Sequence, residues 1–418
     1  MTAITENRPS RHGPAGPDRS GDRVLTGAGG SLERHHEIYG PRALVGHDLI
    51  GMIDAAGLTG RGGAAFPVAR KIAATAQAAR RRHRPIVVAN GAEGEPLSGK
   101  DAVLLHQSPH LVLDGLAAVA EAVGAQAAHL CVPAHRVDEL AAIVGDRAAA
   151  GWDRTPVTVT ATAGRFVDGE TTAIVDLLSG GPGLPRHRVV PSAVRGVGGL
   201  PTLVQNVETL AHVALVARNG AAWFRGRGTA AEPGTALVTL SSRAGIDGVV
   251  ETDLGTPLAV LLRRVAVDPT DLRAVLIGGF HGTWVDGRAV PRLALSARSL
   301  SDAGATPGAG VFSYLLRGER GLPVVADIVC HLAQESAGQC GPCRFGMPAL
   351  AEAMTAVAAG AGAHAARRAI TLADTIDGRG ACSHPDGTAH MVRSALAVFR
   401  DEIGPDGSAT GTTGGHRS

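Results

Sequence analysis

The segment PIVVANGAEGEPLSGKD (85–101) decides the fold class of this chain of 418 residues. It begins as a short apolar run with β-branched side chains, typical of a buried strand, and it ends in an acidic loop rich in glycine. Similar runs recur at 128–132 and 156–161, and Ala-rich helical patterns such as LVLDGLAAVAEAVG (111–124) lie between them. Alternating strands and helices predict an α/β domain, whose ligands bind beyond the carboxyl ends of the strands.

Three further loops carry residues that suit a cofactor. GLTGRGGAAFPVARK (57–71) has four glycines among its first seven residues and leads into a helical pattern that contains Lys71. Backbone amides of such a loop can approach a phosphate, and a helix N-terminus and a lysine add positive potential. The other loops are GRFVDGETTAI (164–174) and GVGGLPTLVQNVETL (196–210). Each loop alone fits a structural turn equally well, but four along one domain indicate a phosphate-bearing cofactor.

Lysine is rare in this chain. Of the 40 basic residues only Lys71 and Lys100 are lysines, and both lie in glycine-rich segments. A lysine carries a compact charge with three rotatable donors, whereas the guanidinium group is larger and planar. We therefore expect both positions to need the ammonium group itself.

The remaining segments have other sequence patterns. Short strand-like runs follow residue 235, and helical patterns with apolar faces follow residue 320. Both ends are rich in Gly, Pro and charge without periodicity, which is typical of disordered tails. The predicted organisation is a tail at 1–33, an α/β domain at 34–230, a β-rich domain at 231–290, a helical domain at 315–403 and a tail at 404–418.

Composition excludes several classes of protein. The formal net charge is +2, so nothing indicates a nucleic-acid partner. No stretch approaches the ~18 uninterrupted apolar residues of a membrane-spanning helix, and a cytoplasmic location is expected. Five cysteines in so long a chain are no disulfide framework, and three of them gather near the C-terminus. A metal or redox centre is therefore expected there.

The motifs GLTGRGGAAFPVARK, NGAEGEP…KD, GETTA and NVETL share their order and approximate spacing with one known family. Over residues 40–403 the chain resembles the FMN- and NADH-binding flavoprotein, the F subunit, of bacterial NADH:quinone oxidoreductase (complex I). The same type of flavoprotein serves NAD-reducing hydrogenases and formate dehydrogenases. The resemblance implies an α/β fold class with a Rossmann-like flavin and dinucleotide domain, a small β-grasp (SLBB) domain and a C-terminal helical bundle with an Fe–S site.

The resemblance also implies the cofactors, which are FMN, NAD(P)H and an iron–sulfur cluster of the 4Fe-4S or 3Fe-4S type. Hydride would pass from the nicotinamide to the flavin, and electrons would then leave singly. Glu93 and Glu95 are the catalytic residues implied. The cofactor-binding residues implied are Gly60, Arg61, Gly62, Gly63, Phe66, Lys71, Asn90, Phe166, Glu170, Thr171 and Asn206.

Three positions depart from the family pattern around the predicted pocket. Ala92 replaces an aspartate of the active-site loop, Thr171 replaces the second acid of GEETA, and Gln205 replaces an asparagine of NNVET. Binding can survive these changes, because the backbone amides and the other acids remain.

A fourth departure affects the predicted cluster. The family pattern S-C-G-x-C-x-P-C-R, with a further cysteine ~40 residues later, holds a [4Fe–4S] cluster. Here the segment reads SAGQCGPCR (336–344), so Cys340, Cys343 and Cys382 remain and Ala337 replaces the first ligand. Thiolate clusters normally have four cysteines. A [3Fe–4S] centre, a [4Fe–4S] centre with water, Ser336 or His384 on the fourth iron, no cluster, and a zinc ion on the three cysteines and His384 all stay open.

The function predicted from these observations is an NAD(P)H-oxidising, FMN-dependent electron-transfer subunit, an enzyme of the NADH dehydrogenase type. Its electrons would go to a ferredoxin, a thioredoxin-like 2Fe-2S subunit or a membrane-bound reductase, so any contact with a membrane would be peripheral and through such partners. One alternative is a degenerate, non-catalytic paralogue that serves as a binding or assembly module. Another is an unrelated nucleotide-binding enzyme with a zinc site.

Overall fold

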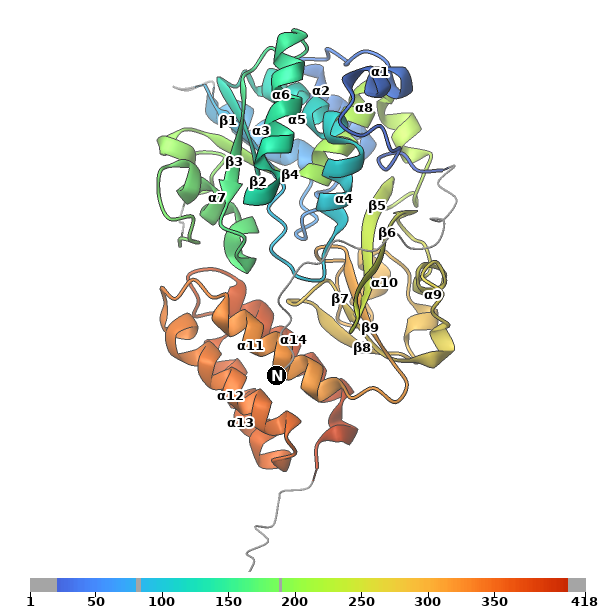
Figure 1. Ribbon diagram of the computed structural model, residues 1–418, viewed down its shortest axis with the longest axis vertical. Helices are drawn as coiled ribbons and strands as arrows, with labels where there is room; N and C mark the ends of the chain where they lie inside the picture. Colours follow the sequence, from blue (N-terminus) through green and yellow to red (C-terminus); the bar gives the residue numbers. More distant parts are fainter. Residues whose placement is uncertain (1–20, 80–83, 188–189, 405–418) are drawn as a thin grey trace, which may run out of the picture.

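The structure is a computed structural model that describes residues 21–79, 84–187 and 190–404. Figure 1 shows an α/β unit at the top, a β-rich unit below it on one side and a helical unit below it on the other. No helix in the described ranges is long and apolar enough to cross a membrane. The predicted α/β fold class with its additional β-rich and helical parts is confirmed.

The α/β unit is built on a parallel sheet with the strand order β3-β2-β1-β4. The predicted apolar runs form β1 (Ile86–Asn90), β2 (Ala127–Pro133) and β3 (Val157–Thr162). The fourth strand, β4 (Thr202–Asn206), lies inside a segment that the sequence indicated only as a loop. Because β4 pairs with β1 in parallel, the carboxyl ends of the two strands meet at one edge of the sheet.

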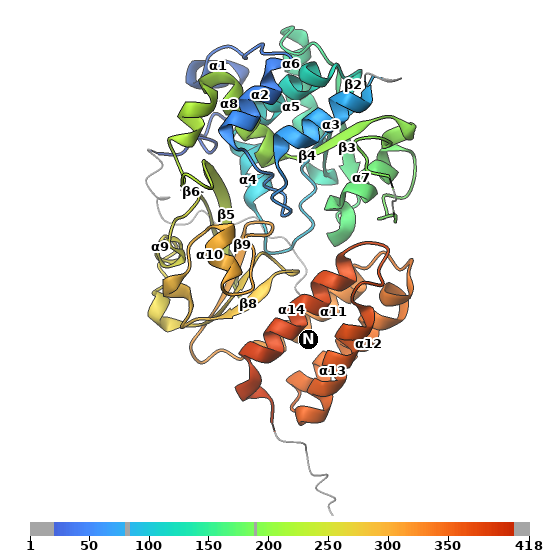
Figure 2. The same ribbon diagram turned by 180° about the vertical axis from the view of Figure 1, so that it is seen from behind.

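Helices cover both faces of this sheet, as Figure 2 shows from behind. Val87 and Ala89 of β1 join the main apolar core, whereas Ile86 and Val88 join a smaller core on the opposite face that also contains Cys131. This alternation is the two-residue period of a strand. The helices of the unit are α1 (Leu32–Tyr39), α2 (Asp48–Ala56), α3 (Val68–Ala79), α4 (Lys100–Gln107), α5 (Pro109–Val123), α6 (Val137–Ala149), α7 (Thr171–Leu178) and α8 (Val207–Arg225).

Helices α5 and α8 cross in close contact at Gly115. A side-chain carbon built at Gly115 would lie 1.9 Å from the carbonyl oxygen of Leu210, so no larger residue fits there without moving a helix. The crossing fixes the start of α8, which follows β4 directly. Gly115 therefore helps to position the end of β4, where the polar residues of the fourth loop lie.

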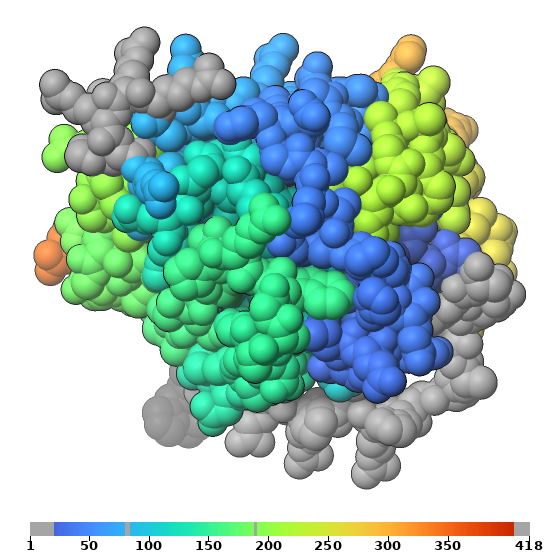
Figure 3. Space-filling model, turned by 90° about the horizontal axis from the view of Figure 1, so that it is seen from above, coloured from blue at the N-terminus to red at the C-terminus, as the bar shows by residue number. Residues whose placement is uncertain are grey.

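The described part of the predicted N-terminal tail is ordered and packed, so the prediction of a tail over 1–33 is wrong for residues 21–33. Val24 and Leu25 are fully buried, and the carboxylate of Glu251 accepts hydrogen bonds from the amides of Arg23 and Val24, both at 2.8 Å. Seen from above, the blue N-terminal part forms a continuous surface with green and yellow-green segments (Figure 3). Residues 1–20 and 405–418 of the two predicted tails lie outside the described ranges.

The β-rich unit is a five-stranded sheet with the order β6-β5-β9-β7-β8. Its last strand lies beyond residue 290, so the predicted range 231–290 is too short. Glycine-rich turns separate this strand from the rest of the sheet in sequence, so the sequence did not indicate that it belongs to the same unit. The strands are β5 (Thr235–Ser242), β6 (Gly245–Asp253), β7 (Leu272–Ile277), β8 (Thr283–Asp286) and β9 (Val311–Leu316), with the short helices α9 (Leu258–Arg263) and α10 (Ala297–Ser301).

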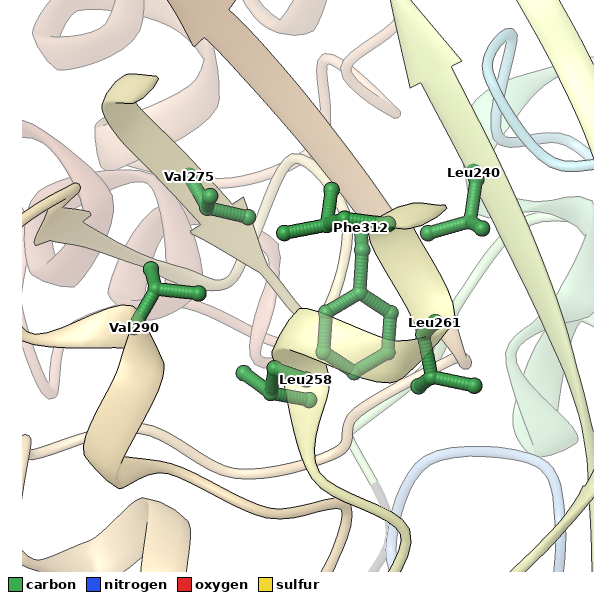
Figure 4. A pocket seen from close by; sticks show the side chains of 7 residues that line it. Leu240, Leu258, Leu261, Val275, Val290 and Phe312 are labelled. Carbon is green, nitrogen blue, oxygen red and sulfur yellow. The ribbon is translucent and has the colours of Figure 1, made fainter. Parts of the chain in front are cut away.

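The core of the β-rich unit contains a small apolar cavity (Figure 4). Its volume is about 10 Å³. The lining is entirely aliphatic or aromatic, and the space is about that of one water molecule. This cavity therefore holds no cofactor. Its lining residues are Leu240, Leu258, Leu261, Leu262, Val275, Val290 and Phe312.

The helical unit contains α11 (Gly321–Gln334), α12 (Met347–Ala358), α13 (Gly362–Ile376) and α14 (His384–Val398), with a π-helical turn at Pro342–Gly346. Its predicted apolar faces are confirmed, because their residues are buried together: Val325, Ile328, Leu332, Met347, Leu350, Met354, Val357, Val392, Leu396 and Phe399. The ring of Phe399 packs against Trp284 of β8 at 5.1 Å, which joins this unit to the β-rich unit. Short 3₁₀ turns lie at Ala134–Arg136, Phe166–Gly169, Val197–Gly199, Pro269–Asp271, Val290–Arg292 and Arg400–Glu402.

Candidate functional site

The four predicted loops meet at the carboxyl edge of the parallel sheet. Asn90 and Asn206 are paired neighbours at the ends of β1 and β4. The side-chain nitrogen of Asn90 donates to the carbonyl oxygen of Gly169 at 2.9 Å, which ties the second loop to the third. The side-chain oxygen of Asn206 accepts from the amide of Glu208 at 2.9 Å and so caps α8.

The first loop presents free backbone amides beside Asn206. It is closed by a hydrogen bond from the amide of Gly60 to the carbonyl oxygen of Phe66, at 2.9 Å. Gly63 has a φ of 104°, a conformation that favours glycine. Within the described part of the chain, the amides of residues 62 to 65 donate to no acceptor. An exposed run of unused donors is the arrangement that binds a phosphate, so this loop fits the phosphate end of FMN.

Arg61 and Lys71, the two cations of the first loop that were predicted to bind the cofactor, are directed differently. The guanidinium of Arg61 turns inward and donates to the carbonyl oxygen of Thr235 at 3.1 Å, so this group is used inside the protein. The ammonium of Lys71 donates to the carbonyl oxygen of Val204 in β4 at 2.5 Å, and burial lowers its pKa. Lys71 therefore lies against the sheet edge near Asn206, whereas the ring of Phe66 is exposed.

The two predicted catalytic acids lie in different surroundings. The carboxylate of Glu93 accepts from the amides of Asp101 and Ala102, at 3.1 and 2.9 Å, and caps α4. The carboxylate of Glu95 accepts from the amide of Phe280 at 3.0 Å, and burial raises its pKa to about 8. Glu95 can therefore hold a proton at neutral pH, while Glu93 shapes its own loop.

The third loop forms a junction with the other two units, which the sequence did not indicate. The ring of Phe166 packs against Phe280 and His281, with centroids 6.3 and 4.9 Å away, and against His384 at 5.5 Å. Its amide donates to the carboxylate of Glu335 at 3.1 Å. An aromatic ring such as that of Phe166 is suited both to stacking on a nucleotide and to packing at such a junction.

The acid and the threonine of GETTA lie at the start of α7. The carboxylate of Glu170 accepts from the amides of Thr172 and Ala173, at 2.7 and 3.1 Å, and so caps the helix. Thr171 is the first residue of α7 and half-buried. Of the two other departures, Ala92 donates its amide to the side chain of Asn90 at 3.1 Å. Gln205 is buried, with a side-chain nitrogen that meets no acceptor within the described ranges.

The three predicted cluster ligands gather where the π-helical turn faces the start of α14. Burial would raise the pKa of Cys340, but the amides of Ala381 and Cys343 donate toward its sulfur and lower the pKa overall. Burial raises the pKa of Cys343 to about 12 and also raises that of Cys382. Backbone donors directed at a sulfur stabilise the thiolate that a metal centre needs. The position of Ala337 supplies no fourth donor.

The hydrogen bonds of His384 count against the zinc alternative. His384 has both ring nitrogens engaged, one with the carbonyl oxygen of Leu332 at 2.8 Å and the other with His281 at 3.2 Å. Across residues 21–79, 84–187 and 190–404, no group of three or more His, Cys, Asp or Glu side chains is arranged to hold a metal ion, and this applies to the three cysteines alone as much as to a zinc site with His384. Three thiolates without a histidine fit a cluster with three protein ligands better than a tetrahedral zinc site.

Buried charges behind the loops were largely missed from the sequence. The ammonium of Lys100 bonds to Asp101 at 2.7 Å and to Glu208 at 2.9 Å. Burial alone would raise the pKa of Glu208, but Lys100, His212 and Arg61 together outweigh this effect and hold it at about 2; burial raises the pKa of Asp101 to about 6. The rarity of lysine was the one sequence signal that pointed to this cluster.

Comparison with known proteins places these features in one family. Residues 53–215 match the model of the Nuo51 FMN-binding domain, and residues 323–405 match that of the NADH-ubiquinone oxidoreductase-F iron-sulfur binding region. The NADH-quinone oxidoreductase F subunit of Streptomyces coelicolor is 31% identical, with 88% of this chain and 86% of that protein covered. The protein of the same name in Mycobacterium tuberculosis is also 31% identical, over 89% of this chain and 88% of that protein.

Solved structures agree. The NAD⁺-reducing [NiFe]-hydrogenase in its H₂-reduced state contains a chain that is 30% identical, with a TM-score of 0.77 over 85% of this chain. This chain spans only 61% of the length of that hydrogenase chain. A chain of the air-oxidised enzyme gives a TM-score of 0.78 at 28% identity, over 95% of this chain and 68% of that one.

The two family models cover the loops of the sheet edge and the cysteines of the helical unit respectively. The cofactors are therefore FMN, NADH and an iron–sulfur cluster. The alternative of a scaffold without turnover gains no support from these matches. The chain belongs to the family of NADH-quinone oxidoreductase F subunits.

Proposed function

We propose that this chain oxidises NADH with FMN at the sheet edge and passes the electrons through its cysteine-bound cluster to a partner protein. The observation that carries this proposal is the first loop, whose amides at residues 62 to 65 are unused and whose Gly62 lies against the side chain of Asn206. FMN, when bound, accepts two electrons as a hydride and releases them one at a time.

The side chains around the loop have separate roles in this proposal. The amides of the first loop bind the phosphate, and Lys71 adds positive potential. Asn90 and Asn206 offer their side-chain amides to the cofactor at the ends of β1 and β4. Glu95, with its pKa of about 8, can donate as well as accept a hydrogen bond near the nicotinamide end. Glu93 and Glu170 keep the second and third loops in place as helix caps.

The electrons leave through the helical unit, which carries Cys340, Cys343 and Cys382. The relatives are subunits of larger complexes by name. A thioredoxin-like 2Fe-2S subunit, a ferredoxin or a membrane-bound reductase is therefore the partner class that we propose. Contact with a membrane would then be peripheral and made through that partner.

The first prediction tests the proposal as a whole. The purified protein should bind FMN noncovalently and reduce ferricyanide with NADH. Lys71→Ala should weaken FMN or NADH binding by about tenfold, because a charged hydrogen bond contributes roughly 1.5–3 kcal/mol. Absorption spectra, flavin titration and steady-state kinetics measure these effects.

Arg70→Ala is the matched control, because Arg70 carries the same charge on the same turn of α3 but its side chain is exposed. Binding should stay unchanged in that variant. A wild-type protein that purifies colourless and binds no added FMN would refute the enzymatic role and leave a scaffold.

The second prediction concerns the nucleotide. Thr171 stands at the start of α7 where the family has an acid, and we propose that this position faces the adenosine ribose. The amide of Arg186 donates to the hydroxyl of Thr172 at 2.8 Å, and the side chain of Arg186, which pairs with Asp176 at 2.5 Å, is 57% exposed. The wild type should therefore tolerate the 2′-phosphate of NADPH, and Thr171→Glu should lower kcat/KM for NADPH relative to NADH by about tenfold, since like charges near a surface repel by roughly 1–4 kcal/mol.

Thr171→Gln has the same size without the charge and should keep the wild-type preference. The ratio of kcat/KM for the two nucleotides is the measurement. An equal ratio in the wild type and in Thr171→Glu would show that this position does not select the nucleotide.

A further inference from the structure

We infer that Lys100 is a positioning residue that holds the amide of Asn206 in the orientation that the cofactor needs, without touching the cofactor itself. This inference rests on the proposed function, because it assigns a role within the same FMN site. Lys100 is only 3% exposed, and its ammonium group is used inside the protein.

A short chain of hydrogen bonds links Lys100 to Asn206. The ammonium donates to one carboxylate oxygen of Asp101 at 2.7 Å, and the other oxygen accepts from the side-chain nitrogen of Asn206 at 2.7 Å. The side-chain oxygen of Asn206 is already occupied by the amide of Glu208. Both ends of this amide are thus fixed, and one N–H of its nitrogen is left for a ligand.

A second branch connects Lys100 with the β-rich unit. One oxygen of Glu208 accepts from Lys100 at 2.9 Å, and the other accepts from the amide of Leu237 in β5 at 2.8 Å. The guanidinium of Arg61, in the first loop, lies 4.0 Å from the same carboxylate. One ammonium group therefore joins the first, second and fourth loops to the neighbouring sheet.

The burial explains why a lysine stands here in a chain that otherwise uses arginine. A side-chain carbon built at Gly310 would lie 3.5 Å from Cδ of Lys100, so the stem is closely enclosed. A compact ammonium fits between two carboxylates at 2.7 and 2.9 Å, whereas a planar guanidinium needs more room. Without the cation, Asp101 and Glu208 would stay buried without their ammonium partner, and at least one would take up a proton or turn away.

This reorganisation has a defined consequence for the site. A protonated or rotated Asp101 no longer holds the side-chain nitrogen of Asn206 in place. The amide can then turn about its cap on α8, and the N–H aimed at the ligand is lost. The effect should appear in FMN binding rather than only in folding.

The test compares FMN affinity in apoprotein prepared from the full chain. Lys100→Met should raise the Kd for FMN, measured by flavin fluorescence, by about tenfold or more, as expected for losing a charge-assisted hydrogen bond. Arg42→Met is the matched control, because Arg42 forms a similarly buried pair with Glu121 at 2.7 Å away from the loops. Its Kd should stay within about twofold of the wild type, although urea unfolding shows a loss of stability.

A double-mutant cycle with Asn206→Ala separates positioning from general damage. If Lys100 acts through Asn206, removing Asn206 should cost much less affinity in the Lys100→Met background than in the wild type. Additive effects would overturn the inference, and so would an unchanged Kd in Lys100→Met. If Lys100→Met fails to fold, Asp101→Asn provides the same cycle with little change in shape. A wild-type protein that binds no FMN would instead refute the proposed function.

Discussion

Replacing Ala337 by cysteine is expected to give a stable [4Fe–4S] cluster in place of one that loses iron. The wild-type chain keeps Cys340, Cys343 and Cys382, and backbone amides donate toward the sulfur of Cys340. A cluster with three thiolates leaves one iron without a protein ligand, so anaerobically purified wild type should contain [3Fe–4S], or [4Fe–4S] with one exchangeable iron. After treatment with a chelator the wild type should retain about three iron atoms per chain, whereas Ala337→Cys should retain about four.

Iron and acid-labile sulfide analysis with EPR spectra measures this change. Gln339→Cys is the matched control, because it adds a thiol to the same loop two residues away from the family position. It should leave the iron content as in the wild type. Stoichiometric zinc without acid-labile sulfide in the native protein would refute the cluster, and the electrons would then leave the flavin directly to a partner.

The second large effect is expected at Asp114, in α5. Its carboxylate is buried and accepts from His35, Arg147, Trp152 and Arg218 at 2.8, 2.8, 3.0 and 2.6 Å. Asp114→Ala leaves two guanidinium groups without this partner in the interior, so the free energy of unfolding should fall by about 3–5 kcal/mol. Urea unfolding of the apoprotein measures it.

The same residue predicts a pH dependence. Burial would raise the pKa of Asp114, but its hydrogen bond to His35 and the charges of Arg147 and Arg218 hold it well below its usual range. A lowered pKa stabilises the fold above the unfolded value of about 3.9 and loses that contribution as the pH falls further. In Asp114→Ala the free energy of unfolding should lack this decrease at acid pH. Asp146→Ala, which removes an exposed acid of α6, should change stability by less than about 0.5 kcal/mol; an equal loss in both variants would contradict the assignment.

The elements with a strong periodic signal could be predicted from the sequence, and those that depend on distant partners could not. The β-branched run of β1 and the apolar faces of α11 and α14 can be recognised from their own stretches of sequence. Strand β4 follows two glycines and a proline, and its sequence alone does not separate it from a loop. Val24 and Leu25 are two apolar residues in a polar segment, and only the acceptor on Glu251 shows why they are ordered.

The same limit applies to the candidate site. The free amides of the first loop follow from its glycines, but the roles of Glu93 and Glu170 as helix caps depend on where α4 and α7 begin. A carboxylate suits a ribose hydroxyl and a helix N-terminus equally well. The junction of Phe166 with Phe280 and His384 joins residues far apart in sequence, and no local pattern encodes it.

The contact between Arg23 and Glu251 also bears on the order in which the chain matures on the ribosome. The two residues are 228 positions apart in sequence. At about 5–20 residues per second, the N-terminal segment waits roughly 10 to 45 s after its own synthesis for the acceptor to emerge. During this interval Val24 and Leu25 lack the partner that later holds their amides. The segment around Arg23 therefore cannot form these contacts until Glu251 has been made, and nascent chains that end before Glu251 should leave it open to proteases and chaperones.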